Sequence, residues 1–499
     1  MSRKKKLLLN IVTGIVKQVI TVICGFVLPR YMLLYYGSSA NGLVSSIAHF
    51  LSFISLLDMG VGAVVQANLY KPLADRDNDQ ISRIIISSER FFRRLALIFI
   101  VYIAILCVAF PLLVDYGTLY TISLLVIISV STLAQYLFGI SYQLLLNADQ
   151  KSYIQLTIQI VTILLNTIIS IVLMKAGASL HIVKLLASIV FIMRPLVQML
   201  YVRKHYNLNT KIKVEGEPIK QKWNGLSQHL AAVICQNIDV TVLTFFSTLE
   251  NISVYTVYYN VTEGLQQIIL TSSNGLESLW GNIIAKQENE KMLNSFNYIE
   301  WAIHMVVTII FTCAAITIVP FVAVYTKGVT DVDYIQPVFG MIMVSAYAAR
   351  CLRMPYFCLI KAAGHFKQTQ NGAYISAIIN IVVTVSLVMR YGLVGVAIGT
   401  FGAMAYHTVY FVWYLRKSIL HRSARKFLEY ILTDAFVAIV SYFVTRSFVN
   451  ICTSYFEWSL LALKVLIYVL LISCCINAIA YWKFVRHSFD IIVQRKKHI

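Results

Sequence analysis

Long apolar runs separated by short polar segments make up nearly the whole chain. A membrane-spanning helix needs about 20 consecutive apolar residues, and each of these runs is that long or nearly so. The pattern therefore predicts an all-α polytopic membrane protein with about fourteen transmembrane helices, at approximately 7–36, 41–70, 91–114, 118–146, 153–176, 180–203, 224–249, 253–285, 298–326, 333–360, 371–390, 393–416, 427–450 and 458–482.

The composition excludes most other classes of protein. Of the 499 residues, 59% are hydrophobic and 13% are charged, whereas soluble domains carry about 25% charged residues. A cytosolic enzyme and a secreted disulfide scaffold are therefore excluded, and no room remains for a large soluble domain. The nine cysteines lie in or beside apolar runs without metal-ligand spacing, so we expect them to pack in the interior.

The positive charges predict an orientation. The basic start of the chain lacks a cleavage site, so we interpret 7–36 as a retained first helix with a cytoplasmic N-terminus. The inner segments then hold 31 Lys and Arg residues and the outer segments four, as the positive-inside rule requires. The net charge of +20 thus reflects membrane orientation, not nucleic-acid binding, and the C-terminus is also predicted to be cytoplasmic.

A faint internal repeat indicates the domain organisation. Aligning Gly60 with Gly275 also aligns Lys71 with Lys286. We expect two six-helix lobes related by a pseudo-two-fold axis along the membrane normal. The predicted parts are the lobes 1–203 and 224–416, a basic cytoplasmic linker 204–223, and two extra helices with a basic cytoplasmic tail at 417–499.

The first run carries a polar stripe that includes Lys17. At 1.5 Å per residue, Lys17 lies about 15 Å beyond Leu7 and so near the midplane, where a lysine facing lipid is costly. We expect it to face a wet cavity and to meet the substrate; the alternative is a structural ion pair with Asp58 of the second run. Arg30 follows Pro29 near the outer surface, and either binds substrate or extends to the interface.

Two further groups of charged residues lie in later runs. Asp239, Glu263 and Glu277 occur on polar stripes of the seventh and eighth runs; together with Asp58 they either bind a coupling ion or neutralise nearby cations.

Arg350 and Arg353 are spaced i, i+3 and share a helix face. Paired guanidinium groups suit a phosphate or pyrophosphate, and the alternative is an interfacial contact with lipid phosphates.

No nucleotide-binding or hydrolase motif occurs in the sequence, and the ten histidines are scattered. We therefore predict a non-enzyme without a cofactor or metal, whose transport is driven by a Na⁺ or H⁺ gradient, the membrane potential or the substrate gradient. The outer loops are too short to hold the acceptor of a membrane glycan polymerase or ligase. A membrane-embedded glycosyl or acyl transferase would need a His/Asp pair at one interface, and none stands out.

Three segments carry a family resemblance: LLDMGVG at 56–62, LIKAAGHFKQTQ at 359–370 and GLVGVAIGT at 392–400. With the 6+6+2 pattern, they resemble bacterial polysaccharide flippases of the multidrug/oligosaccharidyl-lipid/polysaccharide exporter superfamily. The resemblance implies a MATE-like fold in the bacterial inner membrane. It also implies that alternating access moves an undecaprenyl-pyrophosphate-linked oligosaccharide to the outer leaflet, for capsule, exopolysaccharide or O-antigen synthesis.

The resemblance also suggests site residues and partners. The cationic cavity residues typical of the family correspond to Lys17 and to Arg30, Arg350 and Arg353, and a polysaccharide polymerase and chain-length machinery are expected partners. Two alternatives stay open: a cation-coupled multidrug exporter of the same fold, and a flippase for a peptidoglycan or teichoic acid lipid precursor. The relative that flips the peptidoglycan precursor has more arginines in its first helices than this chain, which disfavours that substrate.

Overall fold

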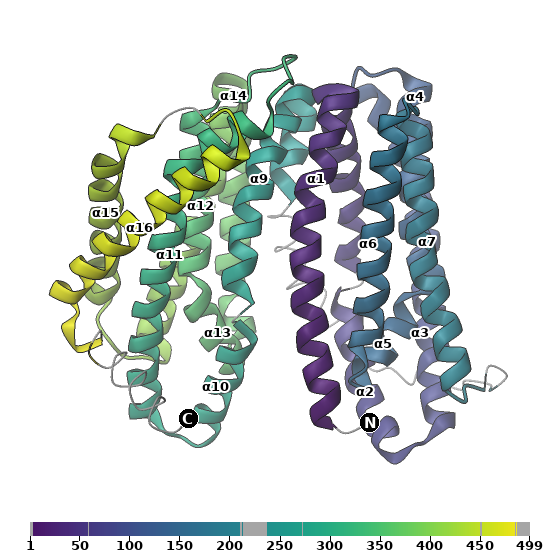
Figure 1. The fold of residues 1–499 in the computed structure, drawn as a ribbon. Helices are drawn as coiled ribbons and strands as arrows, with labels where there is room; N and C mark the ends of the chain where they lie inside the picture. Colours follow the sequence, from purple (N-terminus) through teal and green to yellow (C-terminus); the bar gives the residue numbers. More distant parts are fainter. Residues whose placement is uncertain are drawn as a thin grey trace. The chain divides into compact units, whose positions relative to one another are not determined.

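The computed structural model describes residues 3–57, 59–209, 212, 237–271, 273–449, 452–484 and 486. These residues form helices and contain no strand, as Figure 1 shows. The helices are α1 (Arg3–Ser52), η1 (Phe53–Leu57), α2 (Met59–Asp75), α3 (Asn78–Leu113), α4 (Thr118–Phe138), α5 (Ile140–Ala148), α6 (Ser152–Lys175), α7 (Leu180–His205), a short helix Asn237–Phe246, α9 (Leu249–Leu270), α10 (Ser273–Ala285), α11 (Asn289–Tyr325), α12 (Pro337–Leu352), α13 (Met354–Ala362), α14 (Phe366–Ser418), α15 (Arg425–Thr445), η2 (Arg446–Phe448) and α16 (Tyr455–Ala480).

The predicted polytopic helical architecture is confirmed. Within the described part of the chain, nine helices are long and apolar enough to cross a membrane. Two of them, α1 and α14, extend from one predicted run into the next, and each contains a glycine at which the backbone leaves the helical conformation. Gly37 has a φ of 81° and Gly392 a φ of 53°, a left-handed region that residues with a Cβ rarely enter.

Four of the predicted runs are each divided between two helical segments. The runs at 41–70 and 253–285 are interrupted before α2 and α10, and the runs at 118–146 and 333–360 before α5 and α13. The sequence separation between the starts of α2 and α10 equals that between the starts of α5 and α13. This separation is one residue shorter than the step that aligns Gly60 with Gly275. The helix interruptions therefore recur with nearly the period of the sequence repeat. The symmetry axis stays a prediction.

The chain divides into two compact units, Met1–Ser253 and Val254–Ile499. In the first unit α1 packs along α6, α6 along α7, and α4 against both α3 and α7. In the second unit α12 packs on α14, α11 on α12 and α16, and α10 on α13, while α15 contacts α11 and α16. The predicted linker 204–223 lies largely outside the described residues, so the predicted lobes stay a prediction.

Side-chain burial follows the pattern of a protein surrounded by lipid. Large apolar side chains lie on the outside, including Leu112 at 83% exposure and Met389 at 73%. Polar side chains such as Ser46, Thr262 and Glu300 are fully buried. Lipid can accept apolar groups but supplies no hydrogen bonds, so polar groups are placed in the interior.

Segments predicted to share the inner side meet at one end of the first unit. Lys6 Nζ lies 3.1 Å from Asp149 Oδ1, and Lys151 Nζ lies 2.7 Å from Asp149 Oδ2. Partial burial opposes ionisation of this carboxyl group, but hydrogen bonds from Lys151, Tyr206 and Lys6 hold the pKa of Asp149 below its usual value. The contacts fix the start of α1 to the loop between α5 and α6.

Candidate functional site

The first unit contains two cations near the middle of predicted spans. Lys17 of α1 and Arg194 of α7 are both half-buried and lie within electrostatic range of each other. Among the described residues, neither cation forms an ion pair with a carboxylate. Asp58, the partner considered for Lys17, lies outside the described residues, so that pairing stays a hypothesis.

Arg194 was not among the residues predicted to form the site. Its Nε donates a hydrogen bond to Thr162 Oγ1 of α6 at 2.6 Å, and its guanidinium lies 4.3 Å from the centroid of the Phe191 ring. Figure 1 shows α1, α6 and α7 side by side in this unit. An arginine in the middle of an apolar run is itself a signal of function, but the sequence could not pair it with Lys17, which lies in a distant run.

The other predicted residues of the first unit lie on α1 and on the helix Asn237–Phe246. Arg30 follows Pro29 within α1 and is half-buried. Asp239 is only 4% exposed. Asp239 therefore lies on the interior side of its helix.

A series of buried polar contacts joins the part of α1 beyond Gly37 to residues 237–253 of the same unit. Gly42 belongs to this contact, because a Cβ on it would lie 1.8 Å from the backbone oxygen of Leu249. The side-chain hydrogen bonds join Asn41 to Ser253 (2.8 Å), Ser46 to Thr244 (2.6 Å) and His49 to Asn237 (2.9 Å). The predicted topology puts this contact in the outer half of the membrane, where it holds the two segments together.

The second unit brings Arg350 and Arg353 onto the same side of the α12–α13 junction. Both are half-buried, and both lie within electrostatic range of His407 of α14. The Arg353 guanidinium lies 5.9 Å from the Phe411 ring centroid, and the His407 ring lies 4.4 Å from the same ring. Arg353 therefore faces α14 where the span is interrupted, and His407 is a residue of this region that the sequence did not reveal.

The predicted carboxylates of the second unit have different surroundings. Glu277 of α10 forms an ion pair with Lys361 of α13 at 2.5 Å; neutralising a cation is thus its role in this structure. Glu263 of α9 accepts a hydrogen bond from Gln267 at 2.7 Å. It also lies, like Arg350 and Arg353, within electrostatic range of the buried Cys351.

A buried charge network at the start of α11 was not predicted. Glu300 is fully buried; its Oε1 accepts a hydrogen bond from Arg422 Nη2 at 2.5 Å and another from the hydroxyl group of Tyr356. One turn along α11, His304 Nδ1 lies 2.6 Å from Asp434 Oδ2 of α15. The network fixes α15 and the segment before it to α11, so it anchors the extra C-terminal helices.

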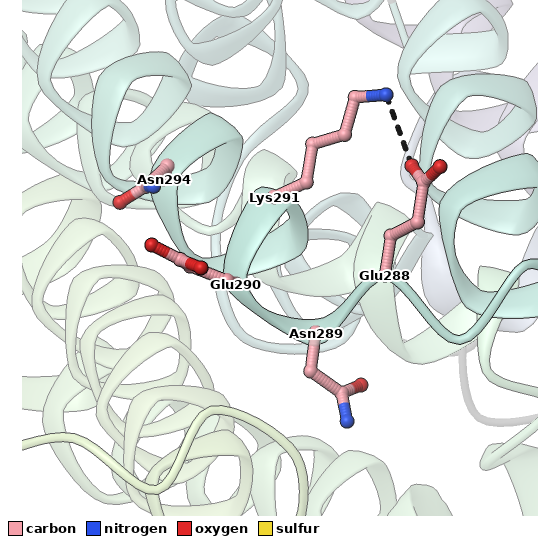
Figure 2. A pocket seen from close by; sticks show the side chains of 5 residues that line it. All are labelled: Glu288, Asn289, Glu290, Lys291 and Asn294. Atoms are coloured by element: carbon pink, nitrogen blue, oxygen red, sulfur yellow. Dashed lines mark ion pairs between the residues drawn. The ribbon is translucent and has the colours of Figure 1, made fainter.

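A surface hollow of about 450 Å³ opens where α11 begins (Figure 2). It is lined by Glu288, Asn289, Glu290, Lys291 and Asn294, and its Lys291 Nζ lies 3.0 Å from Glu288 Oε2. These residues belong to a predicted inner loop and include no candidate site residue. No group of three or more His, Cys, Asp or Glu side chains suited to a metal occurs in the described part of the chain.

No protein-family model and no curated protein matches the chain, but solved structures do. Lipid II flippase MurJ in an inward closed conformation matches with a TM-score of 0.71, covering 96% of this chain and 100% of that one at 14% identity. An inward-facing multidrug resistance MATE family transporter of the MOP superfamily has a TM-score of 0.61, covering 82% of this chain and 96% of that one at 14% identity. The chain has the MATE-like fold of these transporters.

A third solved structure also has this fold. A MOP superfamily transporter from Pyrococcus furiosus, described as having a binding pocket of reversed polarity, matches with a TM-score of 0.55 and 15% identity, over 85% of this chain and 100% of that one. The predicted fold class is confirmed by these structures. At such identities the likeness establishes the fold alone, and the substrate has to be argued from the residues.

Proposed function

We propose that the protein is a flippase that moves an undecaprenyl-pyrophosphate-linked oligosaccharide from the inner to the outer leaflet by alternating access. The observation that carries the proposal is the Arg350–Arg353 pair at the α12–α13 interruption. Two permanently charged, planar guanidinium groups on one side of a broken span suit the bidentate binding of a pyrophosphate. Interrupted membrane helices commonly line a substrate path.

The charge balance supports an anionic substrate over a cationic drug. Neither Lys17 nor Arg194 forms an ion pair with a carboxylate of the described residues, and Glu277 is paired with Lys361. A cation-coupled drug exporter would need carboxylates accessible to the drug. Coupling to Na⁺ or H⁺, a bacterial inner membrane and a polymerase partner belong to the same proposal.

The test changes both arginines together. In cells whose surface polysaccharide depends on this gene, Arg350→Ala with Arg353→Ala should stop surface polysaccharide and accumulate the lipid-linked precursor at normal protein levels. Lysine at either position should restore only part of the activity, because a point charge does not reproduce the guanidinium fork. Arg390→Ala, at the predicted outer end of its run, is the matched control. Full export by the double alanine variant would contradict the proposal.

A further inference from the structure

A cluster of ionisable side chains joins α11 to α15 and to the segment before α15. Glu300 is fully buried and His304 only 2% exposed, and the two lie one turn apart on the same face of α11. Arg422 neutralises Glu300 at 2.5 Å, while His304 Nδ1 lies 2.6 Å from Asp434 Oδ2. With His304 neutral, the two carboxylates of the cluster face a single positive charge. A proton on His304 makes the charges equal, which favours burial of the cluster.

Two atoms of this cluster also lack hydrogen-bond partners. His304 donates its Nδ1–H to Asp434, so Nε2 of the neutral ring carries a lone pair and can only accept a hydrogen bond. This Nε2 is buried without a hydrogen bond from the described residues, and so is Oε2 of Glu300. Two acceptors cannot satisfy each other, and buried polar atoms are nearly always satisfied in folded proteins. One proton on Nε2 supplies the donor that the cluster lacks.

The groups that face this part of α11 favour a proton over a metal ion. The titratable and charged groups are Glu300 of α11 itself, Tyr356 of α13, Asp434 and Tyr430 of α15, Arg422 of the segment before α15, and Tyr481 directly after α16. The Tyr430 ring lies 5.1 Å from the His304 ring and 5.1 Å from the Tyr481 ring. A hard cation such as Na⁺ needs several oxygen ligands, whereas an imidazole nitrogen readily takes up a proton.

The cluster lies within the predicted spans, near their inner ends. His304 is six residues beyond position 298, where its run begins, which is about 9 Å along the helix. Asp434 is seven residues beyond position 427, where its run begins, which is about 10 Å. Both partners of the ion pair are therefore at the same predicted depth, on the cytoplasmic side of the membrane.

We infer that His304, with Asp434 and Glu300 as its partners, forms a proton-binding site, and that the proton bound there is the coupling ion of transport. The proton binds at Nε2, while Nδ1 keeps its hydrogen bond to Asp434. Release of the proton leaves this hydrogen bond without the attraction between opposite charges, which weakens the link between α11 and α15. The coupling part of the inference rests on the proposed function, because coupling needs a transported substrate; proton binding itself does not.

Nitrogen NMR of the full-length protein in phospholipid vesicles tests proton binding. With ¹⁵N-labelled histidine, protonated and neutral rings give different chemical shifts. The signal that is absent from His304→Gln should be protonated at acid pH and neutral at alkaline pH. His205→Gln, which removes an exposed histidine of α7, should leave that signal in place. Asp434→Asn keeps the ring but removes its counter-charge, and should therefore reduce the protonated fraction.

A His304 signal that stays in one form throughout the pH series would overturn the inference. If the ring stays neutral, a buried water satisfies Nε2, and if it stays protonated, the ion pair is only structural. Thermal unfolding of each variant checks that it is folded, and Asp434→Asn keeps the test open if His304→Gln does not fold.

Flipping in the same vesicles tests the coupling. The probe is a fluorescent undecaprenyl pyrophosphate, and a quencher that cannot cross the membrane measures how much of it is in the outer leaflet. An imposed pH gradient should accelerate flipping by the unchanged protein and by His205→Gln. This acceleration should be lost in His304→Gln, and a Na⁺ gradient should accelerate none of the three.

The outcomes separate the proton site from the proposed function. If the unchanged protein flips the probe without any response to the pH gradient, or if His304→Gln responds as strongly as the unchanged protein, the inference is overturned and the proposed function stands. If the unchanged protein does not flip the probe, the proposed function fails and the coupling role falls with it. The NMR titration of His304 then decides by itself whether the proton site exists.

Discussion

Arg422 Nη2 lies 2.5 Å from Oε1 of the fully buried Glu300, and the Arg422 side chain is itself only 11% exposed. The ion pair joins the segment before α15 to the first turns of α11. Tyr356 of α13 donates a hydrogen bond to the same carboxylate oxygen, and Asn297 accepts one from Arg422 Nη1 at 2.6 Å. The carboxylate is therefore shared by three parts of the second unit that are far apart in the sequence.

Removing this carboxylate should destabilise the protein strongly. Glu300→Ala leaves the Arg422 charge buried and unpaired, which costs about 3–5 kcal/mol of the free energy of unfolding. Chemical denaturation of the purified chain in detergent measures the change. Glu429→Ala is the matched control, because its ion pair with Arg425 is exposed and contributes less than about 1 kcal/mol. Equal losses of unfolding free energy in the two variants would show that the buried ion pair stabilises the protein no more than the exposed one.

The role of Lys17 can be separated from a structural pairing with Asp58. If Lys17 serves the substrate, Lys17→Ala should abolish flipping, Lys17→Arg should retain part of it, and Asp58→Asn should be tolerated better than Lys17→Ala. Polysaccharide export in cells, with the amount of protein in the membrane, measures each variant. The double variant Lys17→Ala with Asp58→Asn distinguishes the two roles. If it recovers export, Lys17 serves only as the structural ion-pair partner of Asp58 and not as a substrate contact.

The polar contact between α1 and residues 237–253 should open during transport. A disulfide between S46C and T244C, whose native side chains are 2.6 Å apart, should lock the contact and stop export until a reductant is added. The pair S88C and S141C is the control: the native hydroxyls lie 2.9 Å apart between α3 and α5, and its disulfide should leave export unchanged. Normal export with the first disulfide fully formed would show that the contact stays closed throughout the cycle.

Asp149 should make stability depend on acid pH. Its pKa is held below the usual carboxyl value in the folded protein, so its stabilising contribution is present above about pH 3.9 and is lost as the pH falls through the lower, folded-state pKa. Asp149→Asn should cost about 1 kcal/mol at neutral pH and reduce the loss of stability between pH 5 and pH 3. The exposed Asp75→Asn should leave the pH profile unaltered in a thermal unfolding series.

The orientation predicted from the positive charges can be tested by labelling. A cysteine at position 327 should react with an impermeant thiol reagent added to intact cells, and a cysteine at position 367 should react only after the membrane is opened. A variant in which Cys474 and Cys475, the exposed cysteines of the described residues, are changed to Ser lowers the labelling of natural cysteines. The reverse labelling pattern would show that the orientation in the membrane is opposite to the predicted one.

The sequence by itself determined the class of the fold, and the reason is solvation. A helix that crosses lipid must be apolar over about 20 residues and satisfies its own backbone, so the runs can be read directly from the chain. The interruptions before α2 and α10 and before α5 and α13 are spaced within one residue of the step of the internal repeat, but the sequence did not predict the interruptions themselves. Local periodicity placed Lys17, Arg350 and Arg353 on polar helix faces, because a helix face depends only on nearby residues.

Only the tertiary structure decided which charged groups meet. Arg194 and Lys17 lie in distant parts of the sequence, and the packing of α1 and α7 against α6 brings their helices into one bundle, which no local pattern encodes. The same holds for Glu277 with Lys361 and for Glu300 with Arg422. Whether a charge in the membrane is neutralised by the protein or left for a ligand depends on neighbours across helices, and therefore on the fold as a whole.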